Sequence, residues 1–134
     1  MHELVIVSGI IEAVSDLARK EKKKILRFTV AVGELASFDR SLIEELLNEV
    51  KKGSILEDTQ VDIEVEKAEV LCKSCESTWG FTDLIEPLGE NEREMIHFLP
   101  ELVSSFSRCP KCGGRDLEIR SGRGIRVSYV EFEE

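Results

Sequence analysis

Two short stretches decide the fold, Cys72-Lys73-Ser74-Cys75 and Cys109-Pro110-Lys111-Cys112-Gly113-Gly114, and they contain all four cysteines of the 134-residue chain. Two residues between paired cysteines allow one tight turn to direct both sulfurs at a single ion. Two such turns complete the tetrahedron that Zn²⁺ prefers, and four protein ligands leave no open position for a substrate or an activated water. The spacing therefore predicts a structural zinc site with four ligands, Cys72, Cys75, Cys109 and Cys112.

The residues beside the cysteines indicate how each turn forms. Gly113 suits a close, positive-φ backbone around a thiolate, and Pro110 stiffens the same turn. Glu76 occupies the place in the first turn that Gly113 has in the second, so the backbone turns there at a higher cost. Two other interpretations of the cysteines stay open, namely two redox Cys-x-x-Cys motifs or two disulfides. A redox pair would need an electropositive helix start after a strand, and neither turn has one.

Composition and charge restrict the partners of the chain. It has 18 basic and 27 acidic residues and a net charge of −9, which argues against nucleic acid, because binding to nucleic acid depends on neutralising phosphates. No apolar run approaches the ~20 residues of a membrane span. The N-terminus has no basic region or cleavage signature of a secretory signal. We therefore expect a cytoplasmic protein, in which reducing conditions keep the thiols available for metal.

Hydrophobic periodicity predicts two helices and three strands outside the cysteine region. Apolar residues at three- and four-residue spacing predict an amphipathic helix over residues 4–20. Ser41 and Glu44 have the capping-box spacing that begins a second helix. Alternating apolar residues predict strands over residues 25–32, 61–68 and 125–132.

A zinc ribbon offers too few strands to pair with the strand over residues 125–132. We therefore expect that strand to pair with the one over residues 25–32 or with the one over residues 61–68. The predicted fold is α+β, a three-stranded sheet with two helices on one face plus an inserted Cys₄ zinc-ribbon-like module. A discontinuous domain would comprise residues 1–69 and 121–134, and a zinc-binding domain residues 70–120. Two crossings between the domains would also let two chains exchange domains in a swapped homodimer.

The segment between the cysteine pairs, residues 76–108, exceeds the ~15–20 residues of an ordinary zinc ribbon. Trp79 and Phe81 at alternating positions predict a short strand, and residues 91–98 predict a helical turn. Beyond the second pair, Leu117 and Ile119 are expected to pair back across the module.

The N-terminus has the donors for a different metal. The α-amine of Met1, the amide nitrogen and the imidazole of His2 can form fused chelate rings, and planar nitrogen ligation suits Ni²⁺ or Cu²⁺. Glu3 could add its amide or carboxylate, and His97 is the only other imidazole available as a fourth donor. The competing interpretations are an exposed His2 near a chain end and a His97 partly buried beside its apolar neighbours.

Several of these features together resemble a known family. They are Met1-His2-Glu3-Leu4, an amphipathic helix, a strand that ends in Gly33-Glu34-Leu35, a second helix, and the two cysteine pairs. The order is similar to that of the HypA/HybF family, the nickel metallochaperones of [NiFe] hydrogenase maturation, and the similarity spans the whole chain. The long insert and Glu76 depart from the shorter family form.

The resemblance implies both metals and the partners. It implies nickel on Met1, His2 and Glu3, a structural zinc on the four cysteines, and, as in archaeal members with the insert, His97 as a further nickel ligand. It implies cooperation with a nickel-handling, HypB-like GTPase and delivery of Ni²⁺ to the large subunit of [NiFe] hydrogenase.

The sequence predicts a carrier and not an enzyme, because it has no Ser/His/Asp set, phosphate-binding loop or paired-carboxylate motif. One alternative is a zinc-ribbon nucleic-acid or transcription adaptor. Its support is a local basic patch of five residues, Lys111, Arg115, Arg120, Arg123 and Arg126. The other is a thiol oxidoreductase, which would need one cysteine of low pKa.

Overall fold

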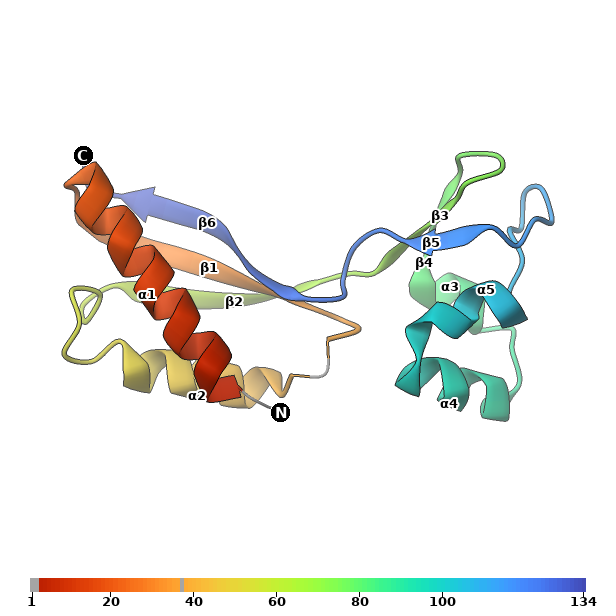
Figure 1. Cartoon of the computed structure of the whole chain (residues 1–134), viewed down its shortest axis with the longest axis horizontal. Coiled ribbons are helices and arrows are strands. Elements are labelled where there is room, and N and C mark those ends of the chain that lie inside the picture. Colours follow the sequence, from red (N-terminus) through yellow and green to blue (C-terminus); the bar gives the residue numbers. More distant parts are fainter. Residues whose placement is uncertain (1–2, 37) are drawn as a thin grey trace. The chain divides into compact units, whose positions relative to one another are not determined.

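The structure is a computed structural model that describes residues 3–36 and 38–134. Its described residues form two compact units (Figure 1). The first unit holds residues 3–32, 38–64 and 125–134, and the second holds residues 33–36 and 65–124. Within the described residues, no helix is long and apolar enough to cross a membrane.

The first unit contains a mixed three-stranded sheet. Its strands are β1 (Ile25–Gly33), β2 (Gln60–Glu66) and β6 (Ile125–Phe132), in the order β2-β1-β6. β6 runs antiparallel to β1, with Phe28 opposite Val130. The last strand therefore returns to the sheet that the N-terminal half builds, and the predicted α+β class is confirmed.

Two helices cover one face of this sheet, α1 (Glu3–Glu21) and α2 (Arg40–Val50). α1 buries a stripe at three- and four-residue spacing, which is the pattern of an amphipathic helix against a core. Phe28 of β1 and Ile43 and Leu47 of α2 have no exposed surface, and burying each such side chain contributes roughly 1.5–3 kcal/mol. The apolar residues whose spacing predicted these elements therefore form the buried core of the first unit.

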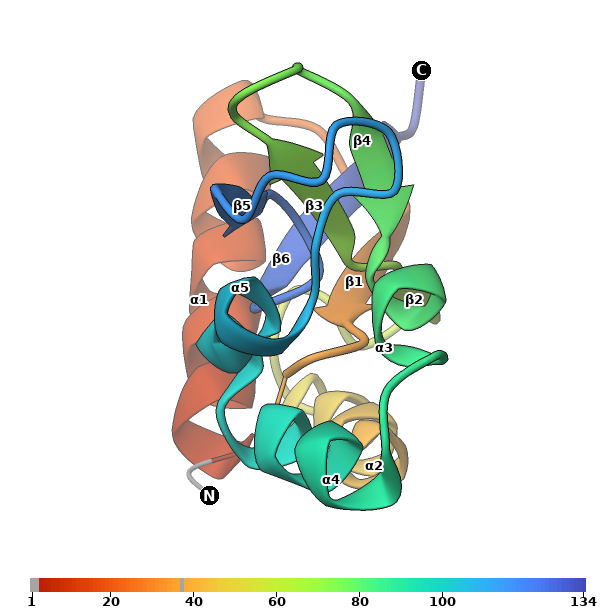
Figure 2. The ribbon, with the colours of Figure 1, turned by 90° about the vertical axis from the view of Figure 1, so that its right-hand side faces the viewer.

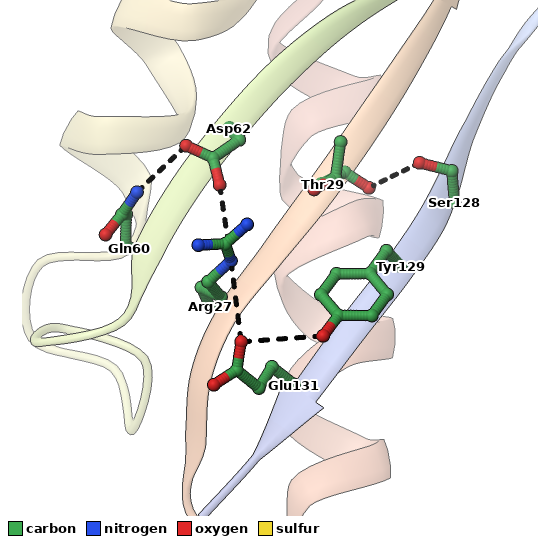
Figure 3. A network of polar contacts seen from close by, with 7 residues as sticks. All are labelled: Arg27, Thr29, Gln60, Asp62, Ser128, Tyr129 and Glu131. Carbon is green, nitrogen blue, oxygen red and sulfur yellow. Dashed lines mark hydrogen bonds and ion pairs between the residues drawn. The ribbon is translucent and has the colours of Figure 1, made fainter.

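The other face of the sheet is polar, and Figure 3 looks onto it with both helices behind the strands. Arg27 of β1 lies 3.7 Å from Asp62 of β2 and 3.6 Å from Glu131 of β6, and its guanidinium lies over the Tyr129 ring. Because these side chains are partly exposed, each ion pair contributes at most about 1 kcal/mol. They keep the face solvated, as is usual for a sheet with one buried side.

The predicted capping box of α2 is wrong. The N-cap is Asp39, whose carboxylate accepts a hydrogen bond from the Leu42 N–H at 3.2 Å. Ser41 is already the second residue of the helix. Asp39 and Ser41 are both good N-cap residues, so the sequence pattern alone did not separate two starts that differ by two residues.

The second unit has its own small sheet and a group of short helices (Figure 2). The strands β3 (Glu69–Cys72), β4 (Thr78–Gly80) and β5 (Leu117–Ile119) are antiparallel, in the order β4-β3-β5. The insert forms α3 (Phe81–Ile85), α4 (Glu90–Phe98), the 3₁₀-helix η1 (Pro100–Leu102) and α5 (Val103–Phe106). The prediction that Leu117 and Ile119 pair back is confirmed, whereas Phe81 begins a helix and does not extend a strand.

Three backbone segments of the second unit meet at Gly33, Ala68 and Gly122. The Gly33 N–H donates to the Gly124 carbonyl at 2.8 Å, and the Leu35 N–H donates to the Gly122 carbonyl at 2.8 Å. A Cβ at Gly33 would lie 2.2 Å from the Gly122 oxygen, so only glycine fits there. The Gly-Glu-Leu stretch therefore has a structural role, because it lets these segments pack backbone against backbone.

The Glu34 side chain also holds together the three backbone segments that meet at Gly33, Ala68 and Gly122. Its carboxylate accepts the Ala68 N–H at 2.5 Å, while its own N–H donates to the Glu66 carbonyl at 2.9 Å. The Glu66 carboxylate in turn accepts the Gly122 N–H at 3.1 Å. Two glutamates thus satisfy backbone N–H groups that have no partner in either sheet.

Gly122→Ala is expected to destabilise the second unit by about 2–5 kcal/mol. Gly122 has φ +84° and its added Cβ would lie 2.6 Å from the Ala68 Cα, and left-handed alanine costs about 1–2 kcal/mol while overpacking costs about 1–3 kcal/mol. Denaturant unfolding followed by the fluorescence of Trp79, the only tryptophan, measures this. Gly124→Ala is the control, since a Cβ there meets nothing within 4 Å, and equal losses in both variants would contradict the close-packing argument.

Candidate metal centre

The structure brings the four cysteines together at one end of the β3-β5 ladder. Their sulfur atoms all lie within 4.8 Å of one another, with 3.6 Å between Cys72 and Cys112 and between Cys75 and Cys109. A tetrahedral zinc site with 2.3 Å Zn–S bonds has sulfurs about 3.8 Å apart. A disulfide would need about 2.05 Å, and all four cysteines are free thiols. The arrangement is therefore that of a metal site and not of two disulfides.

The two cysteine turns are built in the same way. The Glu76 N–H donates to the Cys72 carbonyl at 2.7 Å, and the Gly113 N–H donates to the Cys109 carbonyl at 2.8 Å. Glu76 has φ +64° and Gly113 has φ +74°. The prediction that Glu76 adopts the costly conformation of a glycine position is confirmed.

Hydrogen bonds and neighbouring sulfurs shift the pKa values of the Cys75, Cys109 and Cys112 thiols by different amounts. Burial raises the pKa of the Cys109 thiol, but the backbone N–H groups of Cys112 and Lys111 outweigh it and hold the pKa at about 6. The side chain of Ser77, 3.3 Å from the Cys75 sulfur, lowers the pKa of Cys75.

Cys112 shows the cost of crowding four sulfurs. The Gly114 N–H contacts its sulfur at 3.3 Å and lowers its pKa, yet the Cys72 sulfur and burial raise the pKa to about 12. Four thiolates at this spacing need a cation to offset their repulsion, and a bound divalent metal deprotonates coordinating thiols outright. The donor set therefore fits a soft or borderline cation such as Zn²⁺.

The surroundings of the cysteines differ from those of a thiol oxidoreductase. Cys72 ends β3, and Cys109 and Cys112 lie in the turn region before β5. Neither pair opens a helix in the described part of the chain, so the macrodipole that activates a redox Cys-x-x-Cys is missing there. Sequence reasoning did not anticipate Ser77 beside Cys75, although a hydroxyl two residues after a cysteine was a visible signal.

The predicted nickel ligands are only partly described. Met1 and His2 lie outside the described residues. Glu3 begins α1 in the first unit and is 8% exposed, and its carboxylate accepts the Asp39 N–H at 3.4 Å. Its own backbone N–H, together with that of Asp39, lowers the pKa of the Glu3 carboxyl against the effect of burial.

His97 lies on α4 in the second unit. It is exposed and not partly buried, and its ring meets the Phe98 ring edge to face with centroids 5.5 Å apart. An exposed imidazole is accessible to a metal ion.

Comparison with known proteins identifies the family. The family model described as "Hydrogenase/urease nickel incorporation, metallochaperone, hypA" matches residues 1–132. The chain belongs to the HypA family. Hydrogenase maturation factor HypA of Thermococcus sibiricus is 37% identical over 134 residues, 99% of this chain and 97% of that protein. HypA of Pyrococcus horikoshii is 37% identical over 135 residues, covering 100% and 97% respectively.

Solved HypA structures are similar as well. The solution structure of the nickel metallochaperone HypA from Helicobacter pylori has a TM-score of 0.61 at 26% identity, covering 98% of this chain and 97% of that chain. A second solution structure of a HypA protein has a TM-score of 0.68 at 26% identity, covering 99% and 97%.

Membership of the HypA family gives the general role of this chain. HypA proteins are nickel metallochaperones of [NiFe] hydrogenase maturation, and they are maturation factors without catalytic activity. The predictions of the family and of a non-enzymatic carrier are confirmed. The structure shows a four-cysteine cluster in this chain, and the family to which the chain belongs handles nickel.

Gly113→Ala and Glu76→Gly should change the stability of the metal-loaded protein in opposite directions. Alanine at φ +74° costs about 1–2 kcal/mol, and a Cβ there meets nothing within 4 Å, so the loss is conformational. Glu76→Gly removes the same strain but adds freedom to the unfolded chain, leaving a gain of about 0.5 kcal/mol. Denaturant unfolding in excess zinc measures both.

Glu76→Ala is the control for that pair, because it removes the carboxylate and keeps the Cβ. If Glu76→Ala stabilises the protein as much as Glu76→Gly, the effect comes from charge near the sulfurs and the backbone explanation is wrong.

Proposed function

We propose that this chain binds Ni²⁺ through Met1, His2 and Glu3, holds a structural Zn²⁺ on its four cysteines, and delivers the nickel to the large subunit of [NiFe] hydrogenase with a nickel-handling GTPase. The observation that carries the proposal is the match of the nickel-incorporation family over residues 1–132, which includes the N-terminal triplet. Residues 1–69 and 121–134 form the nickel domain in this proposal, and residues 70–120 form the zinc domain.

The assignment of zinc rests on the closed donor set. Four cysteine sulfurs within 4.8 Å leave no position for a substrate, which is the arrangement of structural sites. Cys72 and Cys109 are 0% and 2% exposed, so a bound ion would be shielded on that side by the core of the second unit. Metal on these ligands would stabilise the fold and perform no chemistry.

The assignment of nickel rests on the donors at the chain end. Amine, amide and imidazole nitrogens form a plane that suits Ni²⁺. Glu3 is the first residue of α1, and an N–H at that position makes no intrahelical hydrogen bond. Ligation through the Glu3 amide would therefore leave the hydrogen bonds of α1 intact, while its carboxylate continues to hold the Asp39 N–H.

In this proposal, release of nickel depends on a partner protein that hydrolyses nucleotide. The sequence has no phosphate-binding glycine loop, so nucleotide hydrolysis would be supplied by a HypB-like GTPase. We place His97 among the nickel ligands as the donor that closes the site. A partner that displaces the insert would then open the site, and nickel would pass on by a change of geometry.

Nickel titration of the untagged, zinc-loaded protein tests the ligand set. The wild-type chain should develop the visible absorbance of a square-planar d⁸ centre. His2→Ala and a variant with one extra residue before Met1 should lose it, because each removes a donor from the fused chelate, and His97→Ala should bind nickel more weakly. Arg93→Ala, on the same helix as His97, is the control for changes in α4.

Equal binding by all these variants, or by none, would remove the basis for the N-terminal site. A salt-sensitive shift of DNA or RNA by the wild-type protein would then favour the zinc-ribbon adaptor.

Nickel affinity should fall by at least ~10-fold between about pH 7.5 and pH 6. Amine, amide and imidazole must all lose protons to bind metal, and the usual pKa values of the amine and imidazole lie near or within this range. Isothermal titration at both pH values measures the change, and zinc content is followed in parallel. An unchanged nickel affinity would exclude ligation by amine and imidazole.

A further inference from the structure

Trp79 is the one tryptophan of the chain, and its indole nitrogen is buried. No described residue accepts a hydrogen bond from this N–H. Buried polar groups in proteins almost always have a partner, so an unpaired indole N–H calls for an explanation. The required partner is an acceptor, because indole N–H is a donor only.

The strand register places Trp79 on the side of the sheet that carries a cysteine. Trp79 lies opposite Val70 of β3, and side chains two residues apart on a strand share a face, so Trp79, Val70 and Cys72 lie on one face. Leu117 of β5 lies opposite Cys72. The indole therefore packs against the apolar cluster that includes Cys72 and Cys109.

The sulfur of Cys109 is the acceptor within reach of the indole. The Trp79 side chain lies beside this sulfur in the apolar cluster, but its N–H makes no hydrogen bond to it without a bound metal. A neutral thiol is a weak acceptor, while a metal-bound thiolate is charged and accepts strongly.

We propose that the Trp79 indole N–H donates a hydrogen bond to the Cys109 thiolate when the four-cysteine site holds a metal. Trp79 is then a positioning residue that stabilises the metal-loaded form, orients Cys109 and restricts access to its sulfur. This inference rests on the proposed metal site. Donors of this kind outside the ligand shell typically change metal affinity by 10–100-fold.

The first experiment uses Co²⁺ as a probe of the site. Trp79→Phe keeps an aromatic ring and removes the N–H, and replacement of the single tryptophan by β-(3-benzothienyl)alanine keeps the bicyclic shape as well. Both should bind Co²⁺ about 10-fold or more weakly in competition with a chelator and should shift the sulfur-to-cobalt charge-transfer bands to lower energy. Phe81→Leu is the matched control, because Phe81 is a buried aromatic of the same cluster without a polar atom.

The second experiment uses the unmodified protein loaded with ¹¹³Cd²⁺, so it does not depend on the folding of a variant. One tryptophan gives one indole N–H signal, and a scalar coupling between that proton and ¹¹³Cd across the sulfur would demonstrate the hydrogen bond directly. The benzothienyl protein cannot give this signal and identifies it.

The outcomes separate the inference from the proposed function. If the wild-type protein binds Co²⁺ tetrahedrally but the benzothienyl protein has the same affinity and bands, and no ¹¹³Cd coupling appears, the role of Trp79 is refuted and the metal site stands. If the wild-type protein shows no tetrahedral thiolate spectrum, the metal site and the role of Trp79 are refuted together.

Discussion

Repulsion among four sulfur atoms within 4.8 Å is the constraint on which the second unit depends. The unequal thiols show it, because the pKa of Cys109 is lowered to about 6 while that of Cys112 is raised to about 12. Cys72 and Cys109 also belong to the apolar cluster with Val70 and Phe81. A cation that balances the sulfurs therefore stabilises the core as well, so metal binding and folding of this unit are coupled.

The first unit is independent of this constraint. Its core is formed by α1, α2 and β1, and its polar sheet face is held by weak ion pairs around Arg27 (Figure 3). The chain passes from this unit to the second where Gly33 and Gly122 approach without side chains. Backbone hydrogen bonds, together with the Glu34 and Glu66 carboxylates, satisfy the backbone N–H groups at that junction. Each unit thus keeps its own core.

Features with a local cause could be predicted from the sequence, and features with a distant partner could not. Periodicity predicted both long helices and the three strands, and cysteine spacing predicted the cluster. The start of α2 at Asp39 was missed because two good caps compete within a few residues. The close approach of Gly33 to Gly122, the Glu34 carboxylate on the Ala68 N–H and the Trp79 indole all depend on residues far away along the chain, and no spacing rule reveals them.

Under the proposed function this chain must keep nickel and zinc on separate ligands, and proteins achieve such selectivity by geometry and ligand type rather than by affinity alone. The sulfurs come as two pairs, each held by matched hydrogen bonds from Cys72 N–H to Ser77 at 2.9 Å and from Cys109 N–H to Gly114 at 2.8 Å. The two turns are also tied to each other, because the Lys73 N–H donates to the Asp116 carbonyl at 2.8 Å and Cys72 lies opposite Leu117 in the β3-β5 pairing. To place four sulfurs in the plane that Ni²⁺ prefers, one turn would have to rotate against the other and break this pairing. This pairing therefore holds the cluster in an arrangement that favours a tetrahedral ion, and under the proposed function the planar nitrogen donors of Met1 and His2 would be the better ligands for nickel.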